Sequence, residues 1–184
     1  MANKITDKEC IDAYQKHKHL KKAADEIGIK WQTLYCRLKK NGIKVVGDKT
    51  KYGSMSDKIG AKGENEFKKL VPLAIDENQN QFQAPIDFTV NGYGVDVKVS
   101  GRKKSGKKYS SQRWAFSIKK QESKCDFFVM MAYSEDHLIL EKVFLIPADM
   151  CRFLQSISIS VNGTSKWLDY EVQPEDLECF FNSL

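Results

Sequence analysis

The sequence predicts an α/β protein in which a small helical unit precedes a β-sheet flanked by helices. Residues 5–45 show short amphipathic helical patterns, and residues 56–74 show a longer one. Most of the chain that follows consists of short alternating or apolar runs bounded by turn residues, as strands are. A chain of 184 residues has room for one core of ordinary size plus a small helical unit.

Charge and composition predict a helical domain over residues 1–45, a linker over 46–56 and a larger domain over 57–184. Residues 1–62 hold fifteen basic and seven acidic residues, a net charge of +8, whereas residues 63–184 hold fifteen basic and seventeen acidic residues, a net charge of −2. The linker is polar, basic and glycine-containing, with no apolar helical stripe. Basic charge concentrated on one segment is typical of proteins that bind a polyanion such as DNA.

Local signals predict where the N-terminal helices begin and end. Thr6 and Asp7 predict the start of a first helix. Gly28 predicts a left-handed turn between the second and third helices, and Asn41-Gly42 predicts the end of the third. The apolar seam shared by these helices is predicted to contain Ile27, Ile29, Leu34 and Leu38, with the small Ala24 where two helices cross closely.

The segment Ala24-Asp-Glu-Ile-Gly28-Ile-Lys-Trp-Gln-Thr-Leu-Tyr35 resembles a helix-turn-helix of the Fis-like type. The resemblance implies that the second helix of this motif enters the major groove of double-stranded DNA, with its first residues nearest the base edges. A protein-binding three-helix unit is the alternative, and the positive charge argues against it. The residues predicted to contact DNA are Lys30, Trp31, Gln32, Thr33, Arg37 and Lys40.

A β-hairpin is predicted at Asn91-Gly92, because both central residues of a tight type I′ turn need a positive φ. A two-residue loop places Asp87 directly opposite Asp96, and Lys98 shares their face because side chains alternate along a strand. A four-residue loop would pair Asp87 with Lys98 instead, and it leaves all three side chains on one face.

Two directly opposed aspartates repel each other, since their Cβ atoms lie roughly 5 Å apart. A divalent cation such as Mg²⁺ would turn that repulsion into a binding site, because it takes carboxylate, water and phosphate oxygens as ligands. Lys98 would then reach a scissile phosphate or a metal-bound water. The alternative reading of the spacing is the solvated face of an edge hairpin that holds a salt bridge.

The helix before the hairpin is predicted to start at Ser56/Asp57 and to bury a stripe that includes Phe67. Glu64 lies on the flank of that stripe and Glu66 lies further round the helix, so Glu64 is the better candidate to face inward. Two solvated glutamates are the alternative.

The sequence Gly60-x-x-Gly63-Glu64 on a helix, then Pro85-Ile-Asp87, then Asp96-Val-Lys98, resembles the PD-(D/E)xK nuclease superfamily. The resemblance implies the restriction-endonuclease-like fold, a mixed β-sheet flanked by helices. It also implies a Mg²⁺-dependent deoxyribonuclease with one or two metal ions, for which Mn²⁺ substitutes. The implied metal ligands are Glu64, Asp87, Asp96 and the carbonyl of Val97. Lys98 would assist the attack of water on the phosphodiester.

A basic loop follows Lys98 and is predicted to grip phosphates near the cut site; a solvated charged loop is the alternative. The spacing of Gly101, Gly106 and Lys107 imitates a phosphate-binding P-loop, but Lys108 stands where Ser or Thr would bind Mg²⁺. The predicted phosphate contacts are Arg102, Lys103, Lys104, Lys107 and Lys108.

The rest of the chain is predicted to complete the sheet and cover it. We expect strands over 113–118, 125–132 and 138–146, of which the second is buried on both faces. A short helix over 148–154, a strand over 157–161 and a last helix opened by Pro174 follow.

The five cysteines show no metal-binding or disulfide spacing, which fits a reducing compartment. The sequence contains no signal-peptide pattern and no apolar run of membrane length. These observations predict a cytoplasmic protein with no membrane partner, and the nuclease resemblance implies a bacterial or phage-encoded one.

Taken together, the two resemblances imply a site-specific DNA endonuclease of the restriction, homing or phage-encoded type. A homodimer is expected, because cutting both strands needs two sites. The alternative is a non-catalytic helix-turn-helix regulator whose second domain dimerises or senses a ligand.

Overall fold

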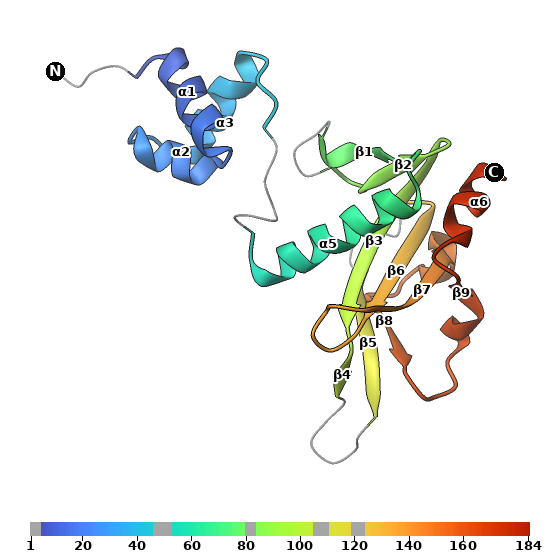
Figure 1. Ribbon diagram of the computed structural model, residues 1–184. Helices are drawn as coiled ribbons and strands as arrows, with labels where there is room; N and C mark the ends of the chain where they lie inside the picture. The colour runs from blue at the N-terminus through green and yellow to red at the C-terminus, as the bar shows by residue number, and fades with distance from the viewer. Residues whose placement is uncertain (1–4, 46–52, 80–83, 105–110, 119–123) are drawn as a thin grey trace. The chain divides into compact units, whose positions relative to one another are not determined.

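The computed structural model describes residues 5–45, 53–79, 84–104, 111–118 and 124–184 (Figure 1). The chain divides into two compact units. One comprises Met1–Lys58 together with Asn78–Ala84, and the other comprises Ile59–Glu77 together with Pro85–Leu184. Most of the predicted linker, at 46–52, lies outside the described residues, as do Lys107 and Lys108 of the predicted basic loop.

Three helices form the first unit: α1 (Asp7–His17), α2 (Leu20–Glu26) and α3 (Trp31–Lys40). The predicted apolar seam is confirmed, because these helices share one core that includes the fully buried Ala24, Leu34 and Leu38. Tight packing of small and branched side chains of this kind fixes the angle at which short helices cross.

The boundaries of these helices follow the local signals. Thr6 caps α1, since its side chain accepts a hydrogen bond from the Glu9 amide while the Glu9 carboxylate accepts one from the Thr6 amide. The turn between α2 and α3 contains Gly28 at φ +70°, and Gly42 at φ +69° follows the end of α3. Both glycines adopt the left-handed conformation that a side chain disfavours.

The second unit contains a six-stranded mixed sheet in the order β1-β2-β3-β6-β7-β9. The pairing of β3 with β6 is parallel, and the other neighbouring strands pair antiparallel. A parallel pair needs a long crossover connection, and the chain between β3 and β6 supplies it. The strands of this sheet are β1 (Ile75–Asp76), β2 (Phe88–Val90), β3 (Tyr93–Gly101), β6 (Phe127–Tyr133), β7 (Leu140–Pro147) and β9 (Glu171–Val172).

Part of that crossover builds a second, three-stranded sheet in the order β4-β5-β8. Its strands are β4 (Lys103–Lys104), β5 (Gln112–Ser117) and β8 (Ser156–Ser160). β5 alternates buried and exposed residues, so Trp114 and Phe116 point inward while Arg113, Ala115 and Ser117 face solvent. Short 3-10 helices η1 (Glu77–Gln79), η2 (Ala148–Cys151) and η3 (Lys166–Tyr170) connect other strands.

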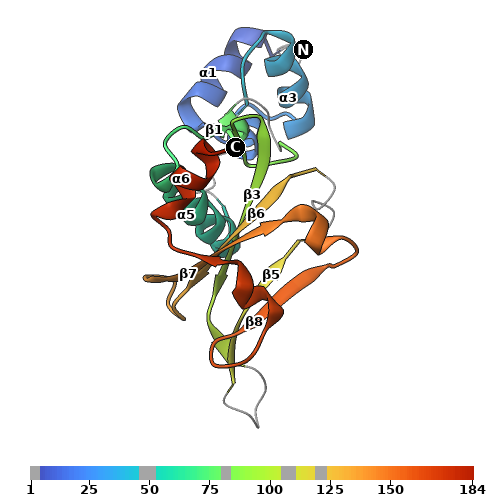
Figure 2. The same ribbon diagram turned by 90° about the vertical axis from the view of Figure 1, so that its right-hand side faces the viewer.

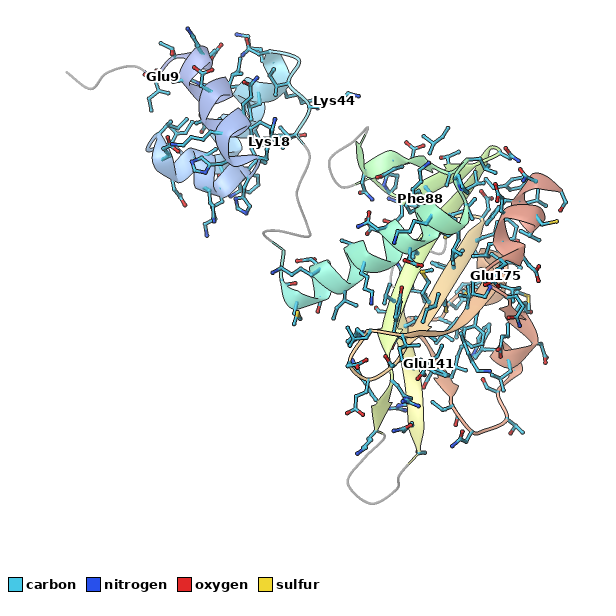
Figure 3. The ribbon with its side chains drawn as sticks, viewed as in Figure 1. Glu9, Lys18, Lys44, Phe88, Glu141 and Glu175 are labelled. Carbon is cyan, nitrogen blue, oxygen red and sulfur yellow. The ribbon has the colours of Figure 1, made fainter. Side chains whose placement is uncertain are left out.

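The two faces of the six-stranded sheet are covered by different layers. Helices α5 (Met55–Leu70) and α6 (Asp176–Asn182) cover one face, and the three-stranded sheet covers the other (Figure 2). On the helical side, Phe67 of α5 packs on Phe88 of β2 with ring centroids 5.0 Å apart, and on Phe181 of α6 at 6.1 Å. Phe88 is labelled in Figure 3. On the other side, Trp114 and Phe116 pack against Phe128, Met130 and Phe144.

The predicted α/β class is therefore confirmed, with a mixed sheet between layers. α5 begins at Met55, slightly earlier than the predicted Ser56/Asp57, because Ser54 caps it. The Ser54 side chain accepts a hydrogen bond from the Asp57 amide, and Asp57 Oδ2 accepts one from the Ser54 amide at 2.8 Å. The buried run at β6 and the final helix are also confirmed. Within the described part of the chain, no helix combines the length and the apolar composition that a membrane span requires.

Candidate functional site

The hairpin that holds the predicted acids has the two-residue loop. Val90 pairs with Tyr93, and Asn91 and Gly92 both have positive φ, at 48° and 88°. The four-residue alternative is therefore wrong. The short loop sets the register so that Asp87 approaches β3 at Asp96 and not at Lys98.

Asp87 ends the pairing of β2 with β3 in an unusual way. Its amide donates to the Val95 carbonyl at 3.1 Å, and its Oδ2 accepts a hydrogen bond from the Val97 amide at 2.9 Å. The Asp87 side chain thus accepts the hydrogen bond that a backbone carbonyl would otherwise accept from the Val97 amide in the β2–β3 ladder. Because the N–H and C=O groups of a strand residue point to the same edge, the Val97 carbonyl faces the side on which Asp87 lies.

Asp96 and Lys98 project from β3 toward the three-stranded sheet. Val95, Val97 and Val99 lie in the core under α5, so the residues between them face the opposite layer. Asp96 is 1% exposed, and its Oδ2 lies 2.6 Å from Lys98 Nζ. Among the described residues, neither Asp96 oxygen accepts a hydrogen bond of ordinary geometry. Burying a carboxylate costs free energy of desolvation, which its contact with a single ammonium group offsets only in part.

This environment raises the pKa of Asp96 from its usual 3.8 to about 7. Burial is the largest cause, a hydrogen bond to Asp87 adds to it, and the positive charge of Lys98 acts in the opposite direction. The negative charge of Asp87 raises the pKa further. The two aspartates are therefore close enough to influence each other, as the hairpin register predicts.

Two further side chains lie beside β3, and sequence patterns alone did not indicate them: Cys125 lies near Asp96, and Asp126 contacts Gly94. The buried thiol of Cys125 has its pKa raised to about 12 by burial and then by the charge of Asp96. Asp126 accepts a hydrogen bond from the Gly94 amide through Oδ2 at 2.7 Å. Both come next to β3 because β6 runs parallel to it, with Phe128 in register with Asp96. A pairing between strands so far apart in sequence has no local signal.

Glu64 belongs to the helix on the other face of β3. Its neighbour Gly63 marks the closest approach of α5 to β3, since a Cβ on Gly63 would lie 2.2 Å from Val99 Cγ2. Glu64 is half-buried. Within the described ranges, no three Asp, Glu, His or Cys side chains gather closely enough to hold a metal ion, so Glu64 does not form one group with Asp87 and Asp96.

The pair Asp87 and Asp96 nevertheless fits a hard divalent cation. The Asp96 carboxylate has Lys98 Nζ at 2.6 Å but accepts no hydrogen bond of ordinary geometry from the described residues, and a second carboxylate lies beside it. Mg²⁺ is usually bound by one or two carboxylates together with water and phosphate oxygens, without a complete cage of protein ligands. The Val97 carbonyl lies on the same side and is available as a further oxygen.

The residues predicted to contact DNA from α3 are mostly exposed. Lys30, Trp31, Gln32, Thr33 and Lys40 all face solvent, and Trp31 is 44% exposed. A hollow of about 440 Å³ opens at the turn between α2 and α3, and its lining includes Lys21, Lys30, Trp31 and Gln32. This combination of a basic rim with an exposed aromatic ring suits contact with a nucleic acid.

Arg37 is also predicted to contact DNA, and its guanidinium group makes contacts within the first unit. Its Nη1 donates to the Ile5 carbonyl at 2.6 Å and lies 3.6 Å from Asp7 Oδ1. Asn41 adds a hydrogen bond to Asp7 Oδ2 at 3.1 Å. These contacts tie the start of α1 to the last turns of α3, so Arg37 helps to hold these two helices together.

In the basic loop after β3, Lys103 and Lys104 are exposed. Arg102 is half-buried and pairs with Glu141 at 3.3 Å. Lys103 is in register with Arg113 of β5, which places a third basic side chain beside the two lysines. The described part of this loop therefore presents a small basic surface.

Neither a protein-family model nor a curated protein matches this chain. Its function has to be inferred from the residues of the two units themselves.

Proposed function

We propose that this protein is a metal-dependent DNA endonuclease, in which Asp87, Asp96 and Lys98 form the catalytic cluster. The observation that supports the proposal most directly is that Asp96 lies next to both other groups: its Oδ2 is 2.6 Å from Lys98 Nζ, and Asp87 is close enough to raise its pKa. Placing two acids and a lysine this close together, with one carboxylate buried, costs free energy of desolvation. Such clusters are often found where a protein binds a cation or catalyses a reaction.

Mg²⁺, or Mn²⁺ in its place, would be held by Asp87, Asp96 and the Val97 carbonyl. Glu64, the helix ligand that the family resemblance implies, lies on the helix that covers the other face of β3 and is left out of this proposal. When bound, such an ion lowers the pKa of a coordinated water and polarises the phosphate. The protein's own residues have separate tasks. The Val97 amide fixes the Asp87 carboxylate by a hydrogen bond, and the surrounding core shields the Asp96 carboxylate from bulk water. The Lys98 ammonium group balances the two carboxylates and is placed to orient a water or a phosphate oxygen.

The N-terminal unit supports DNA as the substrate. Residues 1–62 have a net charge of +8, and α3 exposes Lys30, Gln32 and Trp31 at its first turn. Phosphate contacts supply affinity, and side chains at the start of a helix can read base edges in the major groove. We propose that this unit positions the chain on double-stranded DNA, and that the enzyme acts at a preferred site.

The test is incubation of the purified protein with supercoiled plasmid and genomic DNA in the presence of Mg²⁺ or Mn²⁺. We expect nicking or linearisation that EDTA abolishes. Asp96→Asn and Lys98→Gln should each reduce the cleavage rate about 100-fold or more, because each removes a group that acts on the reacting atoms. Asp149→Asn is the matched control, since this carboxylate lies in η2 and its side chain is 90% exposed.

A non-catalytic helix-turn-helix regulator is the second candidate, and the deep burial of Asp96 favours it. An ion pair that is almost closed to solvent can be purely structural. The two candidates separate when DNA binding is measured by gel shift on the same samples. Binding that survives in both variants together with cleavage that disappears supports the nuclease. Binding without cleavage of any DNA by the wild-type protein supports the regulator.

A further inference from the structure

The edge strands of the two sheets differ in how they are protected against pairing with another chain. β1, β9 and β4 are two residues long, and each contains at least one charged residue: Asp76, Glu171, and Lys103 with Lys104. Short, charged edges of this kind discourage pairing with another chain. β8 is the exception, because it is five residues long and has the uncharged sequence Ser-Ile-Ser-Ile-Ser. It forms the free margin of the smaller sheet (Figure 2).

The backbone groups that β8 leaves unpaired can be identified from its register with β5. The Ile118 amide donates to the Gln155 carbonyl, and the Val161 amide donates to the Gln112 carbonyl. In an antiparallel pair, alternate residues bond to the same neighbour. Ile157 and Ile159 therefore bond to β5, whereas the N–H and C=O groups of Ser156, Ser158 and Ser160 point to the free edge. Across the residues that the structure describes, no backbone hydrogen bond joins this edge to another element.

We propose that β8 pairs antiparallel with β8 of a second copy of this chain, around a two-fold axis at Ser158. The sequence Ser-Ile-Ser-Ile-Ser is the same in both directions, so this pairing matches serine with serine and isoleucine with isoleucine. Three outward-facing residues on each strand would exchange about six hydrogen bonds. The two three-stranded sheets then become one continuous sheet, and the interface is self-complementary, as a two-fold dimer requires.

An exposed aromatic side chain at one end of β8 also supports pairing with a second copy of the chain. Phe153 precedes β8, is 90% exposed and has a φ of +71°. In an antiparallel pair, the residues before one strand lie beside the residues after the other. Phe153 would therefore lie against the turn at 161–164 of the second copy and leave water. The absence of charge from β8 means that two copies meet without repulsion at the centre of the contact.

This dimer does not rest on the proposed chemistry, because its evidence comes from the smaller sheet alone. It would hold two catalytic clusters in one particle if the nuclease proposal is correct. The mass of the particle in solution tests it without any measurement of cleavage.

The test compares two substitutions that add the same charge to the same exposed sheet face. Ser158→Lys places two lysines opposite each other at the two-fold axis, whereas Ala115→Lys adds a lysine directly across from Ser158 on the inner strand β5. We expect light scattering and sedimentation to give a dimer for the wild-type chain and for Ala115→Lys. Ser158→Lys should raise the dimer dissociation constant at least tenfold. A monomeric wild-type chain, or a dimer that Ser158→Lys leaves intact, would overturn the proposal.

A gain-of-function variant covers the case in which Ser158→Lys only damages the fold. In a chain with Cys36→Ser and Cys179→Ser, which removes the two exposed thiols, Ser158→Cys should form a disulfide-linked dimer under a mild oxidant. Hydrogen-bonded antiparallel partners have Cα atoms about 5.5 Å apart, which lies within the range of a disulfide. Ala115→Cys in the same background is the control and should stay monomeric on a non-reducing gel. Equal crosslinking of both variants, or of neither, would contradict the pairing.

Discussion

Replacing Asp96 with asparagine should change how the stability of this protein depends on pH. The carboxyl group has a pKa of about 7 in the native state, mainly because it is buried, against 3.8 when exposed. Between these values the native protein holds a proton that the unfolded chain has lost. Unfolding therefore releases a proton, and the free energy of unfolding falls as pH rises, by about 1.4 kcal/mol per pH unit.

Asp96→Asn has no proton to lose at this position, so its free energy of unfolding lacks this slope. Below about pH 3 the carboxyl group is largely protonated in both states, and this titration contributes little difference between variant and wild type. Across two pH units between the two pKa values, the variant should gain roughly 3 kcal/mol relative to the wild type. Asparagine resembles the protonated acid in shape, and Asp87 remains close to balance the charge of Lys98.

Urea unfolding followed by circular dichroism at about pH 4.5, 5.5 and 6.5, at constant ionic strength, measures this difference. Asp149→Asn serves as the control, because its side chain is almost fully exposed and its unfolding curve should follow that of the wild type. A difference between Asp96→Asn and the wild type that stays constant with pH would refute the reasoning. A wild type that gains stability over the variant as pH rises would show that Lys98 outweighs burial.

Three substitutions test the packing and the hydrogen bonds around the two units. Gly63→Ala should destabilise the protein by about 1–3 kcal/mol in urea unfolding, because the new Cβ would lie 2.2 Å from Val99 Cγ2, and adding Val99→Ala should recover part of the loss. Thr6→Ala removes the cap of α1 and should lower the stability of the N-terminal helices by about 1 kcal/mol, measured by thermal unfolding. Trp114→Phe removes the 2.8 Å hydrogen bond from Nε1 to the Tyr133 carbonyl, and should destabilise by about 1 kcal/mol beyond the loss of apolar area. Unchanged unfolding curves in any of the three would contradict the contact concerned.

Features governed by neighbours in sequence were predictable. The cap at Thr6, the left-handed Gly28 and the loop at Asn91-Gly92 all depend on interactions within a few residues, so local residue types specify them. The hairpin loop then sets the register, and the register brings Asp87 to Asp96. That pair of carboxylates was therefore within reach of sequence analysis.

Features that depend on distant pairing were not predictable. The parallel pairing of β3 with β6 brings Cys125 near Asp96 and Asp126 to Gly94, and no tight turn joins those strands that would predict the pairing from the sequence. The helical stripe of α5 placed Glu64 near a buried face, but it could not say which face of β3 the helix would cover. The DNA contact of Arg37 stays a prediction, but the hydrogen bond from its guanidinium group to the Ile5 carbonyl depends on how α3 packs against the start of α1, which local sequence does not specify.

The sequence by itself determined the helical unit and its turns, the hairpin and the chemical character of its acids and lysine, because each follows from hydrogen bonds and side-chain alternation over short stretches of chain. Only the tertiary structure decided that Asp96 would be buried with a raised pKa, that Glu64 would approach from the opposite layer, and that β8 would be left as an uncharged edge. Burial and edge exposure are properties of how layers stack and strands order themselves, and those depend on contacts between residues far apart in the chain.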